Sequence, residues 1–224
     1  MKITAVIPIR KGSERVIDKN TRAFCDTNLL QYKINVLKEV LEIDEIIVNT
    51  DSEVAIEIAK NNSVGFHMRE SFYASSECSA NDYFWYLGEH TECDIVAYTP
   101  VTSPFIKPQT FRNCIAEFDY ANDKSIVTAS VVKEFLWRGD GPLNFSLDRH
   151  PKSQELTDIQ AINFGLCLIP RKTLVKYRTI IGPNPKIYTV SHIEGLDIDT
   201  PLDFFLAEQV YNKLKNDPEF LTNY

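Results

Sequence analysis

The stretch ITAVIPIRKGSERVIDKN, residues 3–20, decides the fold class. It opens with a run of apolar and β-branched residues, Ile3 to Ile7, which predicts a strand, and it continues into a polar loop. In an open parallel sheet, ligands collect beyond the carboxyl ends of the strands. The loop after this strand is therefore the first place to look for a binding site.

Further apolar runs alternate with helical patterns along the chain. Strands are expected at Ile3 to Ile7, Glu45 to Asn49, Asp94 to Tyr98, Ser125 to Ala129, Gly165 to Ile169 and Lys186 to Val190. Helices are expected where Leu30, Ile34, Leu37 and Leu41 recur, from Ser52 to Asn61, and from Pro108 to near Asp119. This alternation predicts βαβ units, and therefore one α/β domain over residues 1–224 with a largely parallel sheet.

The composition favours a small-molecule partner. The chain has 224 residues, 44% of them hydrophobic, and a net charge of -7. An acidic chain offers no field for a nucleic-acid backbone, and no apolar stretch approaches the roughly 20 residues that a membrane span needs. We therefore expect a cytoplasmic protein with neither partner. The cysteines are scattered and predict reduced packing residues, not disulfides or a zinc site: Cys25, Cys78, Cys93, Cys114 and Cys167.

One stretch, Lys133 to Gln160, breaks the alternation. It carries Gly139, Gly141, Pro142 and Pro151 among charged residues and shows no sustained period. It is too long for an ordinary connection, so it predicts either a mobile lid or a protrusion that packs on another subunit. Apolar residues in a segment that cannot form a compact element need a partner surface, which favours a protrusion in a homodimer.

The first loop has the composition of a phosphate site. Gly12 and Ser13 allow a tight backbone turn, and four cations follow one another within ten residues: Arg10, Lys11, Arg15 and Lys19. Backbone N–H groups and these charges are suited to a triphosphate. The alternative interpretation is a solvated basic connection. The loop matches neither the Walker A pattern nor the dinucleotide fingerprint, which disfavours P-loop hydrolysis and NAD chemistry.

A second site is predicted in GLDIDTPLDF, residues 195–204. Asp197 and Asp199 lie two apart, so on an extended backbone both carboxylates face the same side. Converging carboxylates repel each other unless a cation joins them, and a hard ion such as Mg²⁺ suits oxygen ligands. The alternative is a solvated turn before a helix. Asp203 has a structural interpretation as an early acid of that helix, after Thr200 as its N-cap.

Two other strand ends carry polar residues. Asp51 follows the second strand, and capping the next helix is its more plausible role. Thr102 and Ser103 follow the strand that ends near Tyr98. The four histidines lack metal-ligand spacing, and no chemistry is assigned to them.

These pieces, in this order, resemble the acylneuraminate cytidylyltransferase family, which makes CMP-activated sialic acids, and its keto-deoxyoctulosonate relatives. The opening IPIRKGSERVIDKN resembles an Arg-x-Gly-Ser-Lys-Arg-x-x-x-Lys-Asn motif. NTDS is similar to the second motif, TSPF to a Pro-Thr-Ser-Pro segment, Asn163 to the Asn before a late strand, and DIDTPLDF to the metal-binding end. The matches span nearly the whole chain.

The resemblance implies a three-layer, Rossmann-like nucleotidyltransferase fold with a mixed, mostly parallel sheet. It implies CTP as donor, Mg²⁺ as cofactor, a small acidic sugar as acceptor, and a homodimer in which residues 133–160 reach the neighbour's active site. The implied nucleotide-binding residues are Arg10, Gly12, Ser13, Arg15, Lys19, Asn20 and Arg69. Arg10, Lys19 and Asp199 are implied to be catalytic, Asp197 and Asp199 to hold Mg²⁺, and Thr102, Ser103, Lys152, Gln154 and Asn163 to bind the acceptor.

Four residues depart from the family pattern. Glu14 stands where a phosphate-binding Lys is common, and Arg15 is the candidate to replace that contact. Pro100 replaces a Gln, Ala161 an Arg and Phe164 a Gly at positions that lie toward the sugar in sialic acid enzymes. A related enzyme acting on keto-deoxyoctulosonate, a phosphonate or another small acid therefore remains an alternative, as does a non-catalytic nucleotide-sugar-binding protein.

Overall fold

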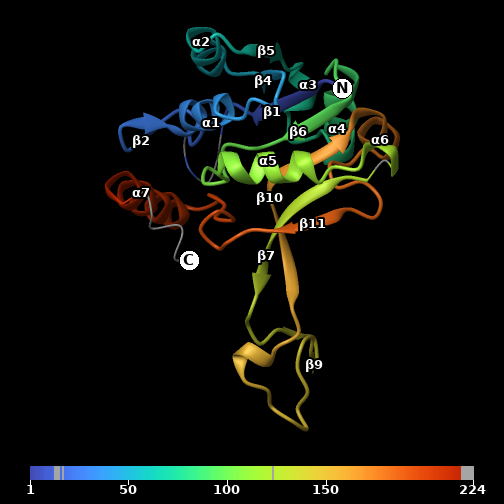
Figure 1. Ribbon diagram of the computed structural model, residues 1–224. Coiled ribbons are helices and arrows are strands. Elements are labelled where there is room, and N and C mark those ends of the chain that lie inside the picture. Colours follow the sequence, from blue (N-terminus) through green and yellow to red (C-terminus); the bar gives the residue numbers. More distant parts are fainter. Residues whose placement is uncertain (13–15, 17, 123, 218–224) are drawn as a thin grey trace.

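A computed structural model of the chain describes residues 1–12, 16, 18–122 and 124–217 (Figure 1). Its centre is a seven-stranded sheet in the order β11-β7-β10-β6-β1-β4-β5. The strands are β1 Ile3–Ile9, β4 Glu45–Thr50, β5 Gly65–Met68, β6 Ile95–Tyr98, β7 Ile126–Val132, β10 Ile159–Pro170 and β11 Lys186–Thr189. β10 runs antiparallel to both of its neighbours, and the other pairings in this sheet are parallel. The expected mixed, mostly parallel sheet is confirmed.

Helices cover both faces of the sheet, which gives the expected three layers (Figure 1). They are α1 Leu29–Lys38, α2 Glu53–Asn61, α3 Ser71–Ala74, α4 Ala80–Glu89, α5 Pro108–Ala116, α6 Arg171–Tyr177 and α7 Pro201–Asn216, with short 3₁₀ turns η1 Tyr120–Asn122 and η2 Ser153–Glu155. Two small ladders join β2 Ala23–Phe24 to β3 Thr27–Asn28 and β8 Trp137–Arg138 to β9 Gly141–Pro142.

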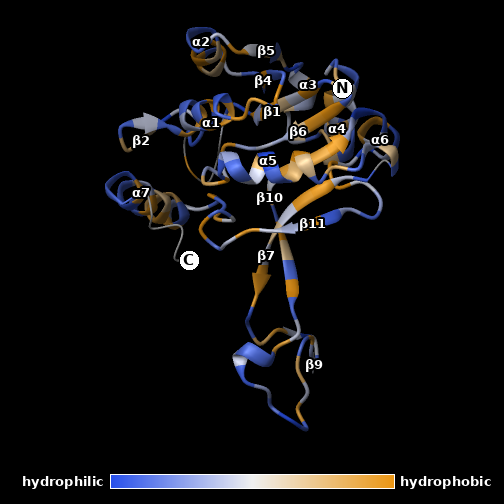
Figure 2. Cartoon of the chain, viewed as in Figure 1, coloured by the Kyte–Doolittle hydropathy of each residue, from blue (hydrophilic) through white to orange (hydrophobic). Residues whose placement is uncertain are grey.

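Alternation along the buried strands divides the core in two. In β1, Ala5 and Ile7 pack in the cluster that includes α1, α2, α5 and α7, whereas Val6 packs in the cluster that includes α4 and α6. Figure 2 shows the apolar residues concentrated in the central strands. Successive side chains of a strand point to opposite faces, so a strand buried on both faces must be apolar throughout. This is why the strands could be recognised in the sequence.

Element ends differ from expectation in particular places. The helix with the Leu30 to Leu41 repeat ends at Lys38; Leu41 is 90% exposed and Val40, at 2%, is buried instead. The placement of Leu41 on the buried face was therefore wrong. The helix that begins at Pro108 ends at Ala116. Strands β7 and β10 continue beyond their expected bounds because they pair with each other outside the helical layers.

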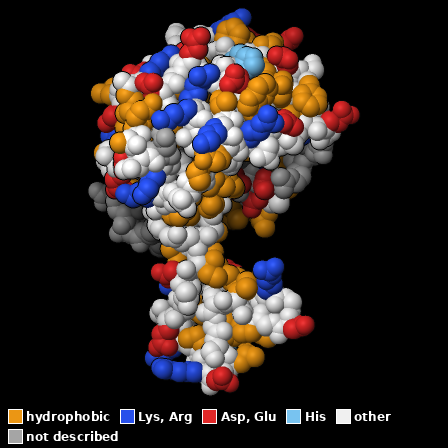
Figure 3. All heavy atoms as spheres, turned by 90° about the vertical axis from the view of Figure 1, so that its right-hand side faces the viewer, with side chains coloured by type: hydrophobic (Ala, Val, Ile, Leu, Met, Phe, Trp, Pro, Cys, Tyr) orange, Lys and Arg blue, Asp and Glu red, His pale blue; other side chains and the backbone are white. Residues whose placement is uncertain are grey.

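Residues 133–158, here called the arm, connect β7 to β10. Figure 1 shows that they project from the sheet, and the label β9 marks one part of this projection. In Figure 3 the arm joins the rest of the molecule through a narrow connection, and hydrophobic side chains lie on its surface. The prediction that this segment protrudes is confirmed; its role in a dimer stays a prediction.

All five cysteines are free thiols, and Cys114 and Cys167 are buried. Over the described part of the chain, no helix combines the length and the apolar character that crossing a membrane requires.

Candidate active site

The carboxyl ends of β1, β4 and β6 meet at one edge of the sheet, because these strands are parallel neighbours. The loop after β1 is tied to the end of β4 by the Lys11 amide, which donates to Asp51 Oδ1 over 2.7 Å. The expectation that Asp51 caps the next helix is wrong. Ser52 is the N-cap of α2, and its Oγ accepts from the Ala55 amide at 3.4 Å. The carboxylate of Asp51 instead holds the first loop.

The described part of the first loop has an exposed basic surface. Gly12 has φ +77°, and apart from its chain neighbours no described residue has an atom within 4 Å of the position that its Cβ would take. The left-handed conformation that favours glycine is thus present where the sequence predicted a turn. Arg10 is exposed, and its carbonyl accepts from Asn20 Nδ2 at 3.4 Å. A small hollow here is lined by Ile9, Arg10, Lys11, Gly12, Asp18, Asn20, Thr21 and Ser52. The candidates Ser13 and Arg15, like Glu14, lie outside the described residues.

The acidic segment, residues 197–199, is hydrogen-bonded to the loop after β6 at the same edge of the sheet. Ile198 is fully buried, and its amide donates to the Thr102 carbonyl at 2.8 Å. The Lys19 amine donates to the Ile198 carbonyl and lies 3.8 Å from Asp199 Oδ1. Asp197 is exposed and Asp199 is half-buried, on either side of the buried Ile198. The structure therefore brings Lys19 and Thr102 together with the predicted acidic pair.

The electrostatics of this pair favour a cation. The side chain of Asp197 is accessible to solvent, yet the protein beside it desolvates the carboxyl enough to raise its pKa. The charge of Asp199 raises that pKa further, while the Thr102 side chain and Lys19 oppose the shift. Because the pKa of Asp197 is raised, the ionised form of this carboxyl is costly, and a nearby cation would lower that cost.

Asp203 has the structural role that the sequence predicted. Thr200 and Asp203 form a capping box at the start of α7: Thr200 N donates to Asp203 Oδ2 at 2.7 Å, and Asp203 N donates to Thr200 Oγ1 at 3.2 Å. The Asp199 amide also donates to Asp203 Oδ2, at 3.1 Å. The helix start thereby fixes the backbone that carries Asp199.

The carboxylates of Asp197 and Asp199 suit a metal ion that a bound ligand also coordinates. Among the described residues, no group of three or more His, Cys, Asp or Glu side chains converges as a metal cage. Mg²⁺ is usually held by one or two carboxylates, water and substrate phosphates, and such a cage is not required. Asp197 and Asp199, beside a basic loop, fit that kind of site.

Two of the residues predicted to bind the acceptor make hydrogen bonds to other parts of the protein instead. Ser103 is fully buried, and its Oγ lies 3.5 Å from the Asn163 carbonyl. The Asn163 side chain accepts from Thr128 Oγ1 at 2.7 Å and from the Gly165 amide at 3.1 Å, and it donates to Ser130 Oγ at 3.2 Å. In this structure, Ser103 and Asn163 support the rim of the site. Thr102 is the more accessible of the acceptor candidates in the loop after β6.

Phe164, the residue after Asn163, has an unusual backbone conformation. Its φ is +55°, and the pairing of β10 with β7 shifts register between Ile162 and Cys167. Its side chain is 40% exposed. A left-handed conformation costs a non-glycine residue about 1–2 kcal/mol, which explains why glycine suits this position.

Arg69 lies near the end of β4, and two of its three guanidinium nitrogens donate hydrogen bonds to other residues of the protein. It is 6% exposed and stacks on Tyr83, with 4.3 Å from Cζ to the ring centroid. Nε donates to Asn49 Oδ1 at 2.8 Å, and one terminal nitrogen donates to the Asn49 carbonyl at 2.9 Å and to the Tyr83 hydroxyl at 3.0 Å. Burial raises the pKa of Tyr83 to about 12, so it accepts as a neutral phenol. The predicted nucleotide contact of Arg69 stays a prediction.

Lys152 and Gln154 are not brought to this edge within one chain. Both are exposed and lie in the arm, Gln154 within η2 and Lys152 at its N-cap. A role for them in acceptor binding therefore requires a second subunit.

Sequence reasoning missed one buried charged residue, Lys33, behind the loop after β6. Lys33, in α1, donates to the Ser103 carbonyl at 2.7 Å and to Thr99 Oγ1 at 3.2 Å. A signal was present: Lys33 lies among Leu30, Ile34 and Leu37 on the apolar face of the helix. A lysine inside such a face is rarely fully buried, which makes the position unusual.

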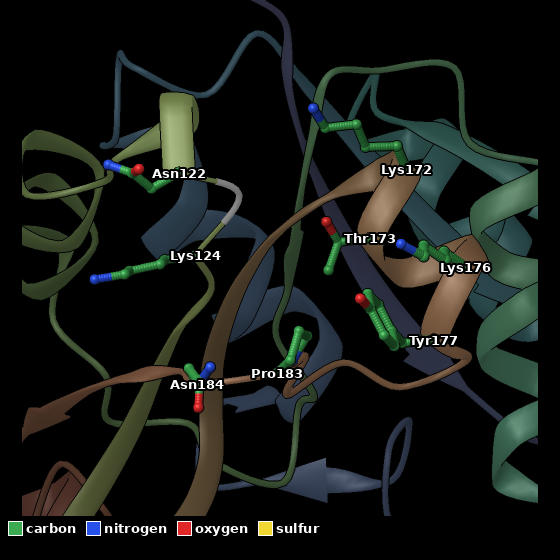
Figure 4. A pocket seen from close by; sticks show the side chains of 8 residues that line it. All are labelled: Asn122, Lys124, Lys172, Thr173, Lys176, Tyr177, Pro183 and Asn184. Atoms are coloured by element: carbon green, nitrogen blue, oxygen red, sulfur yellow. The ribbon is translucent and has the colours of Figure 1, made fainter.

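A separate cavity of about 370 Å³ lies away from this edge, between α6 and the amino ends of β7 and β11 (Figure 4). Its lining includes Lys124, Lys172 and Lys176. In Figure 4 the amino groups of these lysines lie apart and do not point to one spot. Convergent polar groups mark a binding site, so the strand-end edge is the better candidate.

Comparison with known proteins identifies the family. The family described as cytidylyltransferase matches residues 4–150. The chain belongs to the cytidylyltransferase family. This cytidylyltransferase is 27% identical over 224 residues to CMP-N,N'-diacetyllegionaminic acid synthase of Legionella pneumophila, covering 94% of this chain and 96% of that protein. It is 26% identical to pseudaminic acid cytidylyltransferase of Campylobacter jejuni over 229 residues, covering 94% and 97%.

Another relative is longer than this chain. N-acylneuraminate cytidylyltransferase of Escherichia coli is 32% identical over 220 residues, covering 95% of this chain and 52% of that protein, so the chain spans about half of it. Among solved structures, CMP:2-keto-3-deoxy-manno-octonic acid synthetase complexed with CTP superposes with a TM-score of 0.71 at 16% identity, covering 95% of this chain and 99% of that one. That likeness shows the fold. Together with the family match, the sequence relatives place this enzyme among nucleotidyltransferases of the CMP-acylneuraminate synthetase type.

Proposed function

We propose that this cytidylyltransferase transfers CMP from CTP to an acidic sugar of the nonulosonate class, with Mg²⁺ and with release of pyrophosphate. The observation that carries the proposal is the acidic pair Asp197 and Asp199, fastened beside Lys19 at the carboxyl edge of the sheet. The three sequence relatives compared above are named for CMP transfer to sialic, legionaminic or pseudaminic acid, which supports the acceptor class.

The donor half of the proposed site is the loop after β1. Arg10 and Lys19 would bind phosphate oxygens, Gly12 would let the backbone approach them, and Asn20 would contact the nucleotide. Ser13 and Arg15 belong to the same proposed loop but lie outside the described residues. Arg69 would act from behind the site through the guanidinium nitrogen that Asn49 and Tyr83 leave unused.

In the proposed reaction, a hydroxyl oxygen of the acceptor attacks the α-phosphorus of CTP. A new O–P bond forms to CMP, the bond to the β-phosphate oxygen breaks, and pyrophosphate leaves; the hydroxyl proton passes to solvent. Arg10 and Lys19 would stabilise charge on the transferring and leaving phosphates by position and electrostatics. When bound by Asp197 and Asp199, Mg²⁺ would supply further charge neutralisation and lower the pKa of the attacking hydroxyl.

The acceptor half of the proposed site is shared between two subunits. Thr102 would contribute from the rim, supported by Ser103 and Asn163, while Lys152 and Gln154 would come from the arm of a second copy. A two-fold homodimer allows each arm to cover the other subunit's edge. The arm's exposed apolar residues support this arrangement.

Pyrophosphate release tests the proposed function. Purified protein is incubated with Mg²⁺ and CTP together with N-acylneuraminate, diacetyllegionaminate, pseudaminate, keto-deoxyoctulosonate or a small phosphonate. We expect turnover with a nonulosonate and CTP, and little with ATP, GTP or UTP. Turnover confined to keto-deoxyoctulosonate or the phosphonate would redirect the acceptor assignment. CTP binding without turnover on any acceptor would identify a non-catalytic binding protein.

A further inference from the structure

Lys33 is a fully buried cation in the middle of α1. Its relative exposure is 0%, and it lies on the face of the helix that also buries Leu29, Leu30, Ile34 and Leu37. No described carboxylate forms an ion pair with it. Burial in these surroundings lowers the pKa of Lys33 to about 7. A lysine in this position is costly, and an apolar residue of the same length would fill the space without that cost.

The amine of Lys33 joins three elements. It donates to the Ser103 carbonyl at 2.7 Å and to Thr99 Oγ1 at 3.2 Å, both in the loop after β6. Thr99 Oγ1 in turn donates to the Gly165 carbonyl of β10 at 2.8 Å. A neutral amine has two N–H groups, and these two acceptors match them. Helix α1 is thereby linked through the loop to the irregular part of β10.

The same loop carries the acidic segment. The Thr102 carbonyl, one residue before Ser103, accepts from Ile198, which lies between Asp197 and Asp199. Lys33 therefore binds the residue next to the one whose carbonyl pairs with the acidic segment. Thr99 and Ser103 are fully buried and Thr102 is partly exposed, so this loop presents Thr102 at the edge, next to the loop after the neighbouring strand β1.

We propose that Lys33 is a positioning residue for the acceptor: its buried amine fixes the Thr99–Ser103 loop and, through it, the spacing between the acceptor rim and the acidic pair. This inference rests on the proposed function. Protonation would add a third N–H with no described acceptor, so the loop would lose its fit as the pH falls through about 7.

Among the described residues, the segments that supply hydrogen-bond acceptors to Lys33, and β1 beside them, carry no group that titrates near pH 7. β1 contains no titratable side chain from Ile3 to Ile9, and neither does the loop at residues 99–106. Burial raises the pKa of Tyr98 in β6 and of Cys167 in β10, so both stay neutral near pH 7. Tyr32, the neighbour of Lys33 in α1, also has a pKa raised by burial.

Two substitutions and one matched control test the proposal. Lys33→Met removes both donors, and Lys33→Gln keeps two N–H groups that do not titrate. Lys38→Met makes the same chemical change at an exposed position of the same helix, where the amine lies 3.4 Å from Asn62 Oδ1. Pyrophosphate release gives KM and kcat separately for the acceptor and for CTP at pH 6 and pH 8. Hydrogen exchange of peptides covering residues 99–107 reports on the loop without requiring activity.

In Lys33→Met we expect the acceptor KM to rise at least about fivefold while the CTP KM stays within about twofold. In the wild type the acceptor KM should be several-fold higher at pH 6 than at pH 8, and Lys33→Gln should flatten this dependence. Lys38→Met should match the wild type. A folded Lys33→Met with an unchanged acceptor KM and unchanged exchange would overturn the inference.

The proposed function can fail separately. If the wild type releases no pyrophosphate with any acidic sugar, the proposed function is wrong. Faster hydrogen exchange of residues 99–107 in Lys33→Met than in Lys38→Met would then still show that Lys33 holds the loop in place. Equal exchange in the two variants would show that it does not. If Lys33→Met does not fold, the same comparison is made between Lys33→Gln and Lys38→Met.

Discussion

The carboxyl edge of the sheet and the arm differ in how far their side chains are buried. At the edge, Ser103 and Ile198 are fully buried, and backbone hydrogen bonds join segments nearly 100 residues apart, as from Ile198 to Thr102. In the arm, Trp137, Leu143 and Leu147 are 54%, 53% and 65% exposed. The edge is built by contacts within one chain, whereas the arm presents apolar surface that one chain does not cover.

The arm nevertheless has internal structure. The rings of Phe135 and Phe145 meet edge to face with centroids 5.1 Å apart. Asn144, only 7% exposed, accepts from the Leu136 amide at 3.0 Å and donates to the Glu134 carbonyl at 2.8 Å. An ordered segment holds its exposed side chains in fixed places, as a docking surface does. The edge therefore gathers polar groups suited to the proposed chemistry, whereas the arm has the exposed apolar surface that we propose for contact with a second subunit.

The largest expected effect is at the edge. Asp199→Asn should lower kcat by at least about 100-fold, because it removes a negative charge from the proposed metal site while the Asp203 cap still holds the backbone. Pyrophosphate release over a range of Mg²⁺ concentrations measures this. Asp217→Asn is the matched control, since Asp217 is an exposed acid paired with Lys213 at 3.0 Å, and it should retain wild-type rates. Wild-type turnover in Asp199→Asn would refute the assignment of the acidic pair.

An intermediate effect is expected in the arm. Combining Leu143→Ala with Leu147→Ala should weaken self-association at least about tenfold, because each leucine contributes apolar area to the proposed interface. Sedimentation at several protein concentrations measures the dimer dissociation constant. Leu41→Ala combined with Val54→Ala changes exposed apolar residues on the body, 90% and 54% exposed, and should leave association unchanged. Equal dissociation constants for the two double variants would mean that the arm contributes no more to self-association than the body does.

The smallest effect concerns strain at the rim. Phe164→Gly should be more stable than Phe164→Ala by about 1 kcal/mol or less, because glycine accepts φ +55° and the greater freedom of its unfolded chain offsets part of the gain. Chemical denaturation of the two variants measures this difference. Phe164→Ala being the more stable one would mean that the left-handed conformation carries no cost here.

The sequence predicted the sheet because its strands are buried on both faces and are therefore apolar throughout. It also predicted the capping role of Asp203 and the turn at Gly12, since these depend on local geometry. The acidic pair and Lys19 were named from spacing and family resemblance, and the structure adds that Lys19 lies 3.8 Å from Asp199.

What the sequence could not supply depends on long-range contacts. Asp51 binds the Lys11 amide 40 residues away, so its local environment suggested a cap instead. Ser103 and Asn163 were placed in the acceptor site by resemblance, but their side chains are engaged within the protein, Ser103 with Asn163 in β10 and Asn163 with Thr128 in β7. Lys33 has partners 66 and 70 residues away, and no local pattern shows that its amine meets a carbonyl and a hydroxyl.

The central claim is that each active site combines the acidic edge of one subunit with the arm of its partner. Subunit mixing tests it most directly: Lys152→Ala and Asp199→Asn chains, each nearly inactive alone, are mixed and their pyrophosphate release is measured. Each heterodimer should contain one intact site, made from the Asp199 edge of one chain and the Lys152 arm of the other. Activity should therefore return to about a quarter of the wild-type rate at equal mixing, because half of the dimers are heterodimers. No recovery, in a mixture shown to contain heterodimers, would contradict the account and place each site within a single chain.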